Sequence, residues 1–445
     1  MTRESSKPKT NWHDVKHAID TKIHEDQKLF KEPLTIHLVT PMFGGGPQSN
    51  SIDQDRPIRE SAIRGHLRFW WRATRGAVCK NANELSKREA EIFGHTEKSS
   101  LIKVIVEEIF KEKKQIKFPP TYIFQKTPNK MLMGYFKMNV YLTESASMTS
   151  QDKKKLGNEI EAALWAWINF GGLGARTRRG CGSLYCETFS PKEQEVSKER
   201  FDQWFKEKIC QYAISIPEVP REWATLSWEF RLQNKASQTH VSWTRTMDTY
   251  IEFRKKHNIQ NGEAGRSYWP EADSIRHLAN MSHPDHQLPY PSNKPKGYIA
   301  FPRAQFGMPI VFNFKKKSKK DKERSEEEIA KRKWFQKEPN TKTLVPRNKN
   351  RLASPLILKP LAINQKESVG MVMVLQQPKI EALSLLGKGK PLPDVTDEQS
   401  IYPTATYSNN PLRDESGRTH SSAIQAFLHS KEVQTFCQKN QKNKH

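Results

Sequence analysis

The sequence predicts a mixed α+β fold in two domains, and three observations point to it. The chain has 445 residues, more than the ~250–300 that one hydrophobic core usually supports. Runs rich in branched residues alternate with amphipathic helical runs, which favours a sheet with helices on one face. Two prolines at 217 and 220 interrupt the pattern near its middle. We therefore expect domains at 34–220 and 221–445, after a polar leader at 1–33.

The first domain is predicted to begin with a strand and a glycine run, followed by a helix. Asp55 is expected to cap that helix, and Pro57 to lie in its first turn, where no N–H is needed. The remaining elements are read from local periodicity and composition. The expected strands are 34–39, 101–106, 137–142 and a short one through residue 185, and the expected helices are 57–74, 153–169 and 201–209.

The second domain is predicted as a longer version of the same pattern. A loop rich in proline and histidine is expected at 281–296, and a charged insertion at 315–345. We interpret the lysine run that opens the insertion as solvent-exposed, because acidic residues follow it closely. The expected strands are 226–232, 298–301, 310–314, 356–363 and 369–375, and the expected helices are 247–256, one at the end of 265–278, and 422–433.

The helix expected at 57–74 separates its residues into two faces. Apolar side chains fall on one half of a helical wheel at ~100° per residue. Four arginines, Arg64, Arg68, Arg72 and Arg75, form a narrow stripe on the other half. Gly65 lies beside this arginine stripe, where the missing side chain would let a backbone or a ligand approach closely. The pattern predicts a buried helix with a cationic outer edge.

Charge and cysteine content narrow the class of protein. The 74 lysines and arginines exceed the 49 acidic residues, for a net charge of +25, and such an excess indicates a polyanionic partner, with nucleic acid first. The five cysteines include no CxxC pair, which argues against a disulfide framework or structural zinc site. No signal peptide or apolar run of ~20 residues is visible. We expect a cytoplasmic protein without a metal or cofactor.

A second glycine-rich loop follows the helix expected at 153–169. It reads GLGARTRRGCG at 172–182. Glycines let a backbone come close to a phosphate or base, and arginines supply opposite charge. The loop lacks the Gly-Lys-Ser/Thr of a phosphate-binding loop and follows a helix, unlike a dinucleotide fingerprint. Either a nucleic-acid contact or a turn with surface arginines is consistent with it.

Together the two glycine loops carry a resemblance to a known family. GLGARTRRGCG fits the G-x-G-x5-G-x-G loop of the RAMP superfamily of CRISPR-associated RNA-binding proteins. TPMFGGG and RPIRESAIRGHLRFWWRATRG, in 40–76, resemble the RAMP subunit at the 3′ (head) end of the type III-B, or Cmr, effector complex. Blocks at 265–278, 301–314 and 351–363 are similar to later parts of that subunit.

The resemblance implies two tandem ferredoxin-like (RRM-like) modules and a place in a ribonucleoprotein with other Cmr RAMP subunits. Its ligands would be guide RNA and complementary target RNA. We expect the glycine loops and nearby arginines to track an RNA backbone. Phe43, Phe69 or Trp71 could stack a base. The candidate RNA-binding residues are Gly44, Gly45, Arg56, Arg59, Arg64, Arg68, Arg72, Arg75, Gly172, Gly174, Arg176, Arg178, Arg179, Gly180, Gly182 and Arg303.

Two readings of activity remain from the sequence. RAMP relatives include ribonucleases that process guide RNA with an acid–base pair, and a backbone subunit that cuts target RNA with an aspartate. His37 and His66 are expected to be structural, because no second catalytic group pairs with them. Asp53 is expected to be a turn residue and Asp55 a helix cap. We expect a non-catalytic subunit, with a RAMP-type endoribonuclease that cuts guide precursor or target RNA as the alternative.

Overall fold

The computed structural model describes residues 27–46, 51–53, 55–111, 131–143, 148–260, 263–281, 299–314, 338–404 and 410–438. Its first sheet is antiparallel throughout. The pairing follows the order β3-β4-β2-β5, and β1 also pairs with β4. The strands are β1 Gln27–Lys28, β2 Leu34–Met42, β3 Ile102–Lys111, β4 Leu132–Leu142 and β5 Leu184–Tyr185.

Four α-helices accompany this sheet. Helix α2 lies in the connection between β2 and β3, and α4 in the connection between β4 and β5. The apolar half of α2, including Ile63 and Leu67, is buried as the wheel predicted. Helix α4 starts with a capping box between Thr149 and Asp152. The helices are α2 Glu60–Ala73, α3 Ala82–Phe93, α4 Ser150–Phe170 and α5 Lys198–Gln211, with 3₁₀ turns η1 Arg75–Val78, η2 Thr177–Arg179 and η3 Glu193–Glu195.

A second antiparallel sheet, in the order β12-β13-β6 with β7 also on β13, forms the core of the second half. Every residue of β12 is buried, because helices cover both faces of this sheet. Side chains such as Ile357 and Met371 join the core that contains α4 and α5, whereas Leu358 and Val372 join the core of α6, α10 and α11. The elements are β6 Phe230–Leu232, β7 Ser237–Gln238, α6 Thr239–Arg254, β12 Leu356–Ala362, β13 Glu367–Val374, α10 Ala423–Leu428 and α11 Lys431–Cys437.

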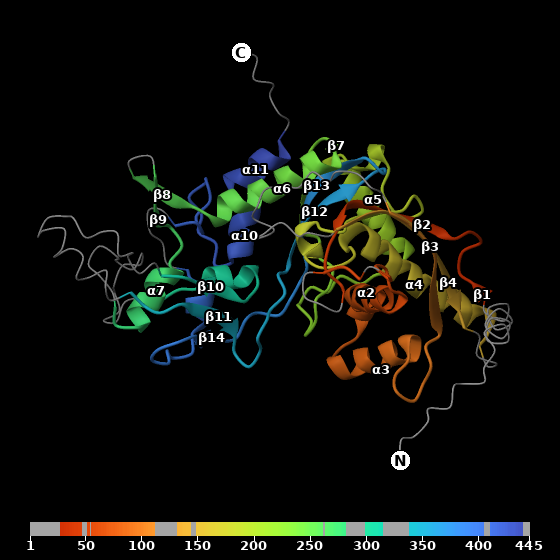
Figure 1. The fold of residues 1–445 in the computed structure, drawn as a ribbon, viewed down its shortest axis with the longest axis horizontal. Coiled ribbons are helices and arrows are strands. Elements are labelled where there is room, and N and C mark those ends of the chain that lie inside the picture. The colour runs from red at the N-terminus through yellow and green to blue at the C-terminus, as the bar shows by residue number, and fades with distance from the viewer. Residues whose placement is uncertain are drawn as a thin grey trace, which may run out of the picture.

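A third, smaller core lies at the other end of the molecule (Figure 1) and packs α7 against the sheet β10-β11-β14. The hairpin β8–β9 leads into it from α6. Its elements are β8 His257–Gln260, β9 Glu263–Ser267, α7 Glu271–Leu278, η4 Pro302–Phe306, β10 Ile310–Phe312, β11 Lys342–Pro346, β14 Leu383–Leu386 and α9 Glu398–Ile401. No helix in the described part of the chain is long and apolar enough to cross a bilayer.

The predicted mixed helix-and-sheet fold is confirmed, and several local predictions are wrong. Helix α2 begins at Glu60, its N-cap position is Arg59, and no side chain caps it, so Asp55 is not the cap and Pro57 precedes the helix. Residues 299–301 are not a strand. Of the strand expected at 226–232, only residues 230–232 form one, as β6. The terminal helix divides at Ser430, whose hydroxyl accepts the Val433 N–H to start α11.

Two further predictions fall wholly or partly outside the described residues. Of the loop at 281–296, only residue 281 is described, and of the insertion at 315–345, residues 338–345 are described and contain most of β11. The predicted boundary at 220 stays a prediction. One apolar core contains residues from both sides of it, Tyr212 and Leu226 among them.

Candidate nucleic-acid interface

The two glycine-rich loops that the sequence singled out lie against each other. The Ala175 N–H donates to the Phe43 carbonyl at 2.8 Å, and the Gly182 N–H donates to the Pro41 carbonyl at 2.9 Å. A Cβ at Gly44 would lie 2.9 Å from the Cβ of Ala175. The loop after β2 and the loop after α4 therefore form one surface element, which we call the paired glycine loops (residues 43–46 and 171–182).

Most glycines of the second loop are required by packing within the chain. Gly180 and Gly182 have positive φ angles of 79° and 60°, which side chains rarely adopt. A Cβ at Gly180 would lie 2.4 Å from the Trp243 ring nitrogen, and one at Gly182 would lie 2.0 Å from the Leu173 carbonyl oxygen. Cβ atoms at Gly172 and Gly174 would also meet carbonyl oxygens, at 2.7 and 2.5 Å. These four glycines allow the loop to fold on itself and against α6.

Two of the loop's three arginines point into the second half of the chain. Arg178 donates to the Ser354 carbonyl, and its guanidinium lies 5.6 Å from the Phe69 ring centroid. Burial, with the nearby charge of Arg179, lowers the pKa of Arg178 to about 10. The ring of partly buried Phe69 therefore faces an arginine of this chain.

Arg179 makes a second set of contacts across the same junction. It donates to the Leu356 carbonyl at 3.2 Å and lies 4.7 Å above the Tyr250 ring. Its own carbonyl accepts the Trp243 ring N–H at 2.8 Å. Arg178 and Arg179 thus tie the loop to β12 and α6.

A smaller set of the predicted residues does face solvent. Arg176 is exposed in a left-handed conformation with a φ of 57°, and Gly45 and Arg56 are exposed on the neighbouring loop. Arg59 donates to the Gly45 carbonyl, which keeps its guanidinium beside the exposed glycine. We call these four residues, Gly45, Arg56, Arg59 and Arg176, the outer loop set.

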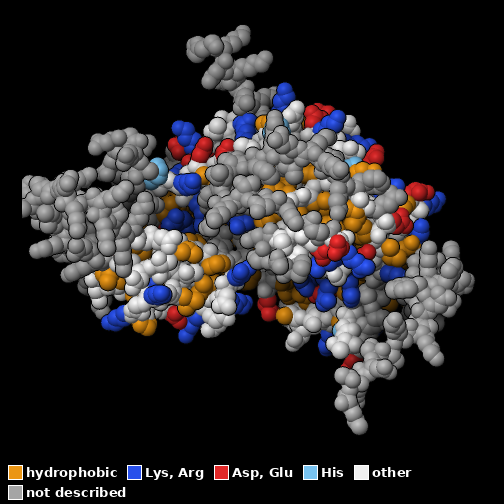
Figure 2. All heavy atoms as spheres, in the orientation of Figure 1, with side chains coloured by type: hydrophobic (Ala, Val, Ile, Leu, Met, Phe, Trp, Pro, Cys, Tyr) orange, Lys and Arg blue, Asp and Glu red, His pale blue; other side chains and the backbone are white. Residues whose placement is uncertain are grey.

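The arginine stripe of α2 faces helix α3, which the sequence did not predict. Glu89 of α3 is 7% exposed at its side chain and accepts Arg68 at 2.5 Å and Arg72 at 2.8 Å. Arg64 donates to the Phe93 carbonyl at the end of α3. Figure 2 shows Lys, Arg, Asp and Glu side chains intermixed over α2. Glu89 therefore compensates part of the charge of the stripe within the chain.

The other two predicted cations also have internal partners. Arg75 lies 3.4 Å from Glu159 of α4 and donates to the Tyr212 carbonyl at 3.1 Å. Arg303 pairs at 2.9 Å with Glu271, whose side chain is fully buried. Phe43 and Trp71, predicted as possible base-stacking residues, are 1% and 0% exposed, so that prediction is wrong for both.

The candidate catalytic residues all have structural contacts. His37 lies between Tyr135 and Tyr185, with ring centroids 5.2 and 6.1 Å away. His66 stacks on Trp167, and burial lowers its pKa to about 4. These positions agree with the expected structural roles.

Asp53 forms the predicted turn. Its carboxylate accepts the backbone N–H groups of Asp55 and Arg56 at 3.1 and 3.0 Å, and the bond from Arg56 contributes most to lowering its pKa. Within the described ranges, no cluster of three or more His, Cys, Asp or Glu side chains has the geometry of a metal site.

Lys359 is a buried residue that the sequence reading missed. It lies in the middle of β12, fully buried, and donates to the Gly171 carbonyl at 2.8 Å. A second carbonyl, of Ile168, lies 3.4 Å away, and burial lowers the Lys359 pKa to about 7. The lysine inside the apolar run LILKPLA is the sequence feature that could have marked it as a buried cation. It fixes the start of the second glycine loop against the second sheet.

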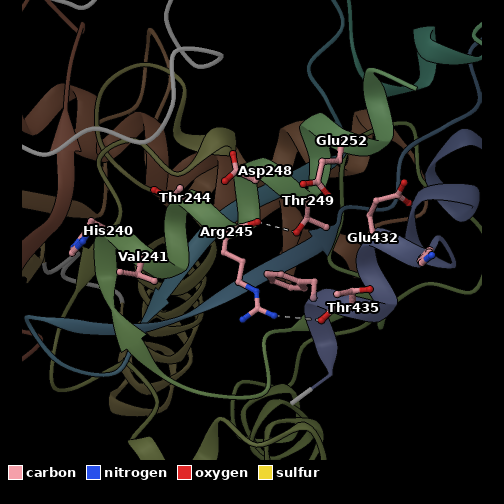
Figure 3. Close-up of a pocket in the computed structure, with 11 residues that line it drawn as sticks. His240, Val241, Thr244, Arg245, Asp248, Thr249, Glu252, Glu432 and Thr435 are labelled. Carbon is pink, nitrogen blue, oxygen red and sulfur yellow. Dashed lines mark hydrogen bonds between the residues drawn. The ribbon is translucent and has the colours of Figure 1, made fainter. Parts of the chain in front are cut away.

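A pocket of about 680 Å³ lies away from these loops, between α6 and α11 (Figure 3). Asp248 and Glu252 of α6 and Glu432 of α11 line it, and burial raises the pKa of both Asp248 and Glu252. None of the sequence-predicted candidates lines it. Its lining mixes these three carboxylates with the cations Arg245 and Lys431, so it lacks the uniform positive charge that a phosphate backbone favours.

Comparisons with known proteins show what the part of the chain that contains these loops is similar to. Residues 35–185, from the start of β2 to the end of β5, match the model of the RAMP superfamily. The predicted resemblance to RAMP subunits is thereby confirmed. The match includes both paired glycine loops, α2 and α3.

The more particular similarity is to subunits named Cmr. The chain is 28% identical over 184 residues to "CRISPR system Cmr subunit Cmr1-2" of Pyrococcus furiosus, covering 35% of this chain and 95% of that protein. A crystal structure of Cmr1 from P. furiosus aligns with a TM-score of 0.42 and 16% identity, over 78% of this chain and 88% of that one. A chain of a cryo-EM structure of the Type III-B Cmr-beta bound to cognate target RNA aligns with a TM-score of 0.41 and 13% identity. That alignment covers 78% of this chain and 95% of that one.

Proposed function

We propose that this chain is a non-catalytic RNA-binding subunit of a type III-B CRISPR ribonucleoprotein. It would act in the cytoplasm in antiviral RNA interference, with other Cmr RAMP subunits as neighbours. Guide RNA and target RNA are the proposed ligands. The observation that carries the proposal is the outer loop set. It combines exposed Gly45, Arg56 and Arg176 with Arg59, whose guanidinium donates to the Gly45 carbonyl, in the RAMP-matching part of a strongly basic chain.

The chemistry of the outer loop set suits a single-stranded RNA backbone. Exposed Gly45 lets a phosphate approach the main chain, and the guanidinium groups of Arg56, Arg59 and Arg176 offer charged donors. The other glycines and arginines of the paired glycine loops hold this surface in place from behind. Contacts of this kind bind RNA of any sequence with strong salt dependence.

The proposed architecture is a pair of ferredoxin-like modules. In the first, the chain order β2-α2-β3-β4-α4-β5 with the sheet order β3-β4-β2-β5 is the arrangement expected of a β-α-β-β-α-β unit. In the second, β6-α6-β12-β13 followed by α10 and α11 supports the same unit up to its last helix. The third core is built from two segments, one between α6 and β12 and one between β13 and α10.

The non-catalytic assignment rests on the contacts of the acid–base candidates. The Asp53 carboxylate is occupied by two backbone N–H groups. His66 is neutral at physiological pH because burial lowers its pKa. Asp53 lies beside Arg56 as the acceptor of a turn, and the neighbouring charges of Arg56 and Arg59 favour its ionised form.

The test is binding and cleavage of labelled guide and target RNA by the full chain, in EDTA and in Mg²⁺. Replacing Arg56, Arg59 and Arg176 with alanine should weaken binding and flatten the slope of log K against log salt by roughly 2, at ~0.7 per lost phosphate contact. The matched control replaces three exposed cations elsewhere, Arg200, Lys206 and Lys366, and should change the slope little. An equal loss in both variants would remove the outer loop set from the proposal. Cleavage that Asp53→Ala or His37→Ala abolishes would overturn the non-catalytic assignment.

A further inference from the structure

The outer edge of β6 is an unpaired strand edge in the described part of the chain. Strand β6 pairs with β13 alone, with Arg231 opposite Val372. The Glu229 carbonyl accepts the Val374 N–H at 2.9 Å, and the Gln233 N–H donates to the Gly370 carbonyl at 2.8 Å. Since antiparallel strands alternate the direction of their backbone groups, those of residues 230 and 232 point away from β13.

The first half of the chain shows what occupies the same edge there. Strand β2, like β6, precedes its module's first long helix and pairs on one side with a central strand, β4. On its other side β2 pairs with β5, where His37 faces Tyr185 and Leu38 faces Leu184. Among the described residues no strand takes the corresponding place beside β6. The second module therefore leaves room for one more strand.

A pocket of about 440 Å³ lies beside this edge. Residues 230–232 and 234 line it together with Trp228, which is 49% exposed. Helix α5 contributes Asp202, and α10 and α11 contribute Leu428 and Val433. The free edge is thus recessed between helices, in a largely apolar hollow.

The shape and chemistry of the pocket select the kind of occupant. A recessed edge admits one extended chain, but the same recessed edge on a second copy could not reach it. RNA is disfavoured, because the charged residues that line the pocket are Asp202 and Arg231. Arg231 donates to the adjacent Phe230 carbonyl at 2.9 Å. An added strand would replace that side-chain bond to Phe230, and the outward N–H groups of residues 230 and 232 and the apolar walls are what an added β-strand requires.

We propose that an extended segment of a neighbouring protein subunit adds to β6 as a further strand and packs an apolar side chain against Trp228. This inference rests on the proposed function, because it takes the chain to be part of a multi-subunit complex. It assigns a protein-docking site on the second module, separate from the outer loop set on the first.

Amide hydrogen exchange tests the docking site without any mutation. The full chain is compared alone, with guide RNA, and in the complex formed by co-expression with the other subunits of its type III-B system. The amides of Phe230 and Leu232 should exchange at least tenfold more slowly in the complex only. Slow exchange in the free chain would mean that another segment of this chain already pairs there, and would overturn the inference. Unchanged exchange in the complex, or slowing by RNA alone, would also overturn it.

A matched pair of substitutions gives a second readout. Trp228→Glu should reduce incorporation into the complex at least tenfold while leaving the RNA affinity of the free chain unchanged. Val311→Glu, at an exposed apolar residue of β10 that is 55% exposed, should incorporate normally. Equal incorporation of both variants would contradict the docking site. Failure of the unmodified chain to join any complex or bind RNA would instead contradict the proposed function.

Discussion

The arginine stripe of α2 and the outer loop set contain the same side chain in two different electrostatic settings. Arg68 and Arg72 meet the buried carboxylate of Glu89, whereas Arg56 and Arg176 are exposed and the carboxylate that acts on Arg56 and Arg59 is the solvent-accessible Asp53. A helical wheel shows which residues share a face, but not which element lies opposite that face. Arginine clustering therefore identifies an RNA surface only after the internal carboxylates have been located.

The largest expected effect comes from the inward side of the paired glycine loops. Gly182→Ala should destabilise the protein by about 4 kcal/mol, because it adds a Cβ at a positive φ and against a backbone carbonyl. The urea unfolding midpoint measures this. The control is Gly65→Ala, at a helical glycine with nothing within 4 Å of its added Cβ, which should stabilise by up to about 1 kcal/mol. A tolerated Gly182→Ala would show that the loop is not fixed by packing.

Acid should weaken the buried side of α2 through His66. The folded-state pKa of about 4 lies below the ordinary 6.5, so the unfolded chain binds the proton more readily. The contribution of neutral His66 is complete above pH 6.5 and is lost as pH falls to about 4, by up to about 3 kcal/mol. Lys359, with its pKa lowered to about 7, titrates above this window.

The measurement for His66 is the difference in unfolding free energy between the unmodified chain and His66→Gln at several pH values. The variant should lose less stability between pH 6.5 and 4. His95→Gln, at an exposed histidine, is the control and should follow the unmodified chain. Parallel curves for all three proteins would contradict the buried neutral state of His66.

A smaller effect is expected where α3 compensates the arginine stripe. Glu89→Gln should cost about 2 kcal/mol, because it removes the charge that two partly exposed arginines share. Glu91→Gln, exposed on the same helix, should stay within about 0.5 kcal/mol. Equal urea midpoints for the two variants would mean that the stripe does not depend on Glu89.

Local periodicity was sufficient for the elements with strong apolar patterns. Strands β2, β12 and β13 and helices α2 and α4 lie where branched residues or the wheel placed them, and Asp53 makes the predicted turn. The two glycine loops were also recognised from their motifs, and both lie within the residues that match the model of the RAMP superfamily. How they contact each other depends on the tertiary fold.

The missed elements have weak local signals. Helix α3 has few apolar residues, and its buried Glu89 makes sense only opposite Arg68 and Arg72, which lie about twenty residues earlier. Asp55 and Pro57 suggested an early helix start, but α2 begins at Glu60 without a side-chain cap. The inward direction of Arg178 depends on Ser354, in the other half of the chain.

The central claim is that the outer loop set binds RNA while the arginine stripe supports the fold. Two triple-alanine variants, at Arg56, Arg59 and Arg176 and at Arg64, Arg68 and Arg72, should be compared for the salt slope of RNA binding and for the urea midpoint. The first should flatten the slope by roughly 2 with an unchanged midpoint, and the second should lower the midpoint with an unchanged slope. The account would be contradicted if the stripe variant had a flattened salt slope and an unchanged urea midpoint while the outer-loop variant kept the slope of the unmodified chain.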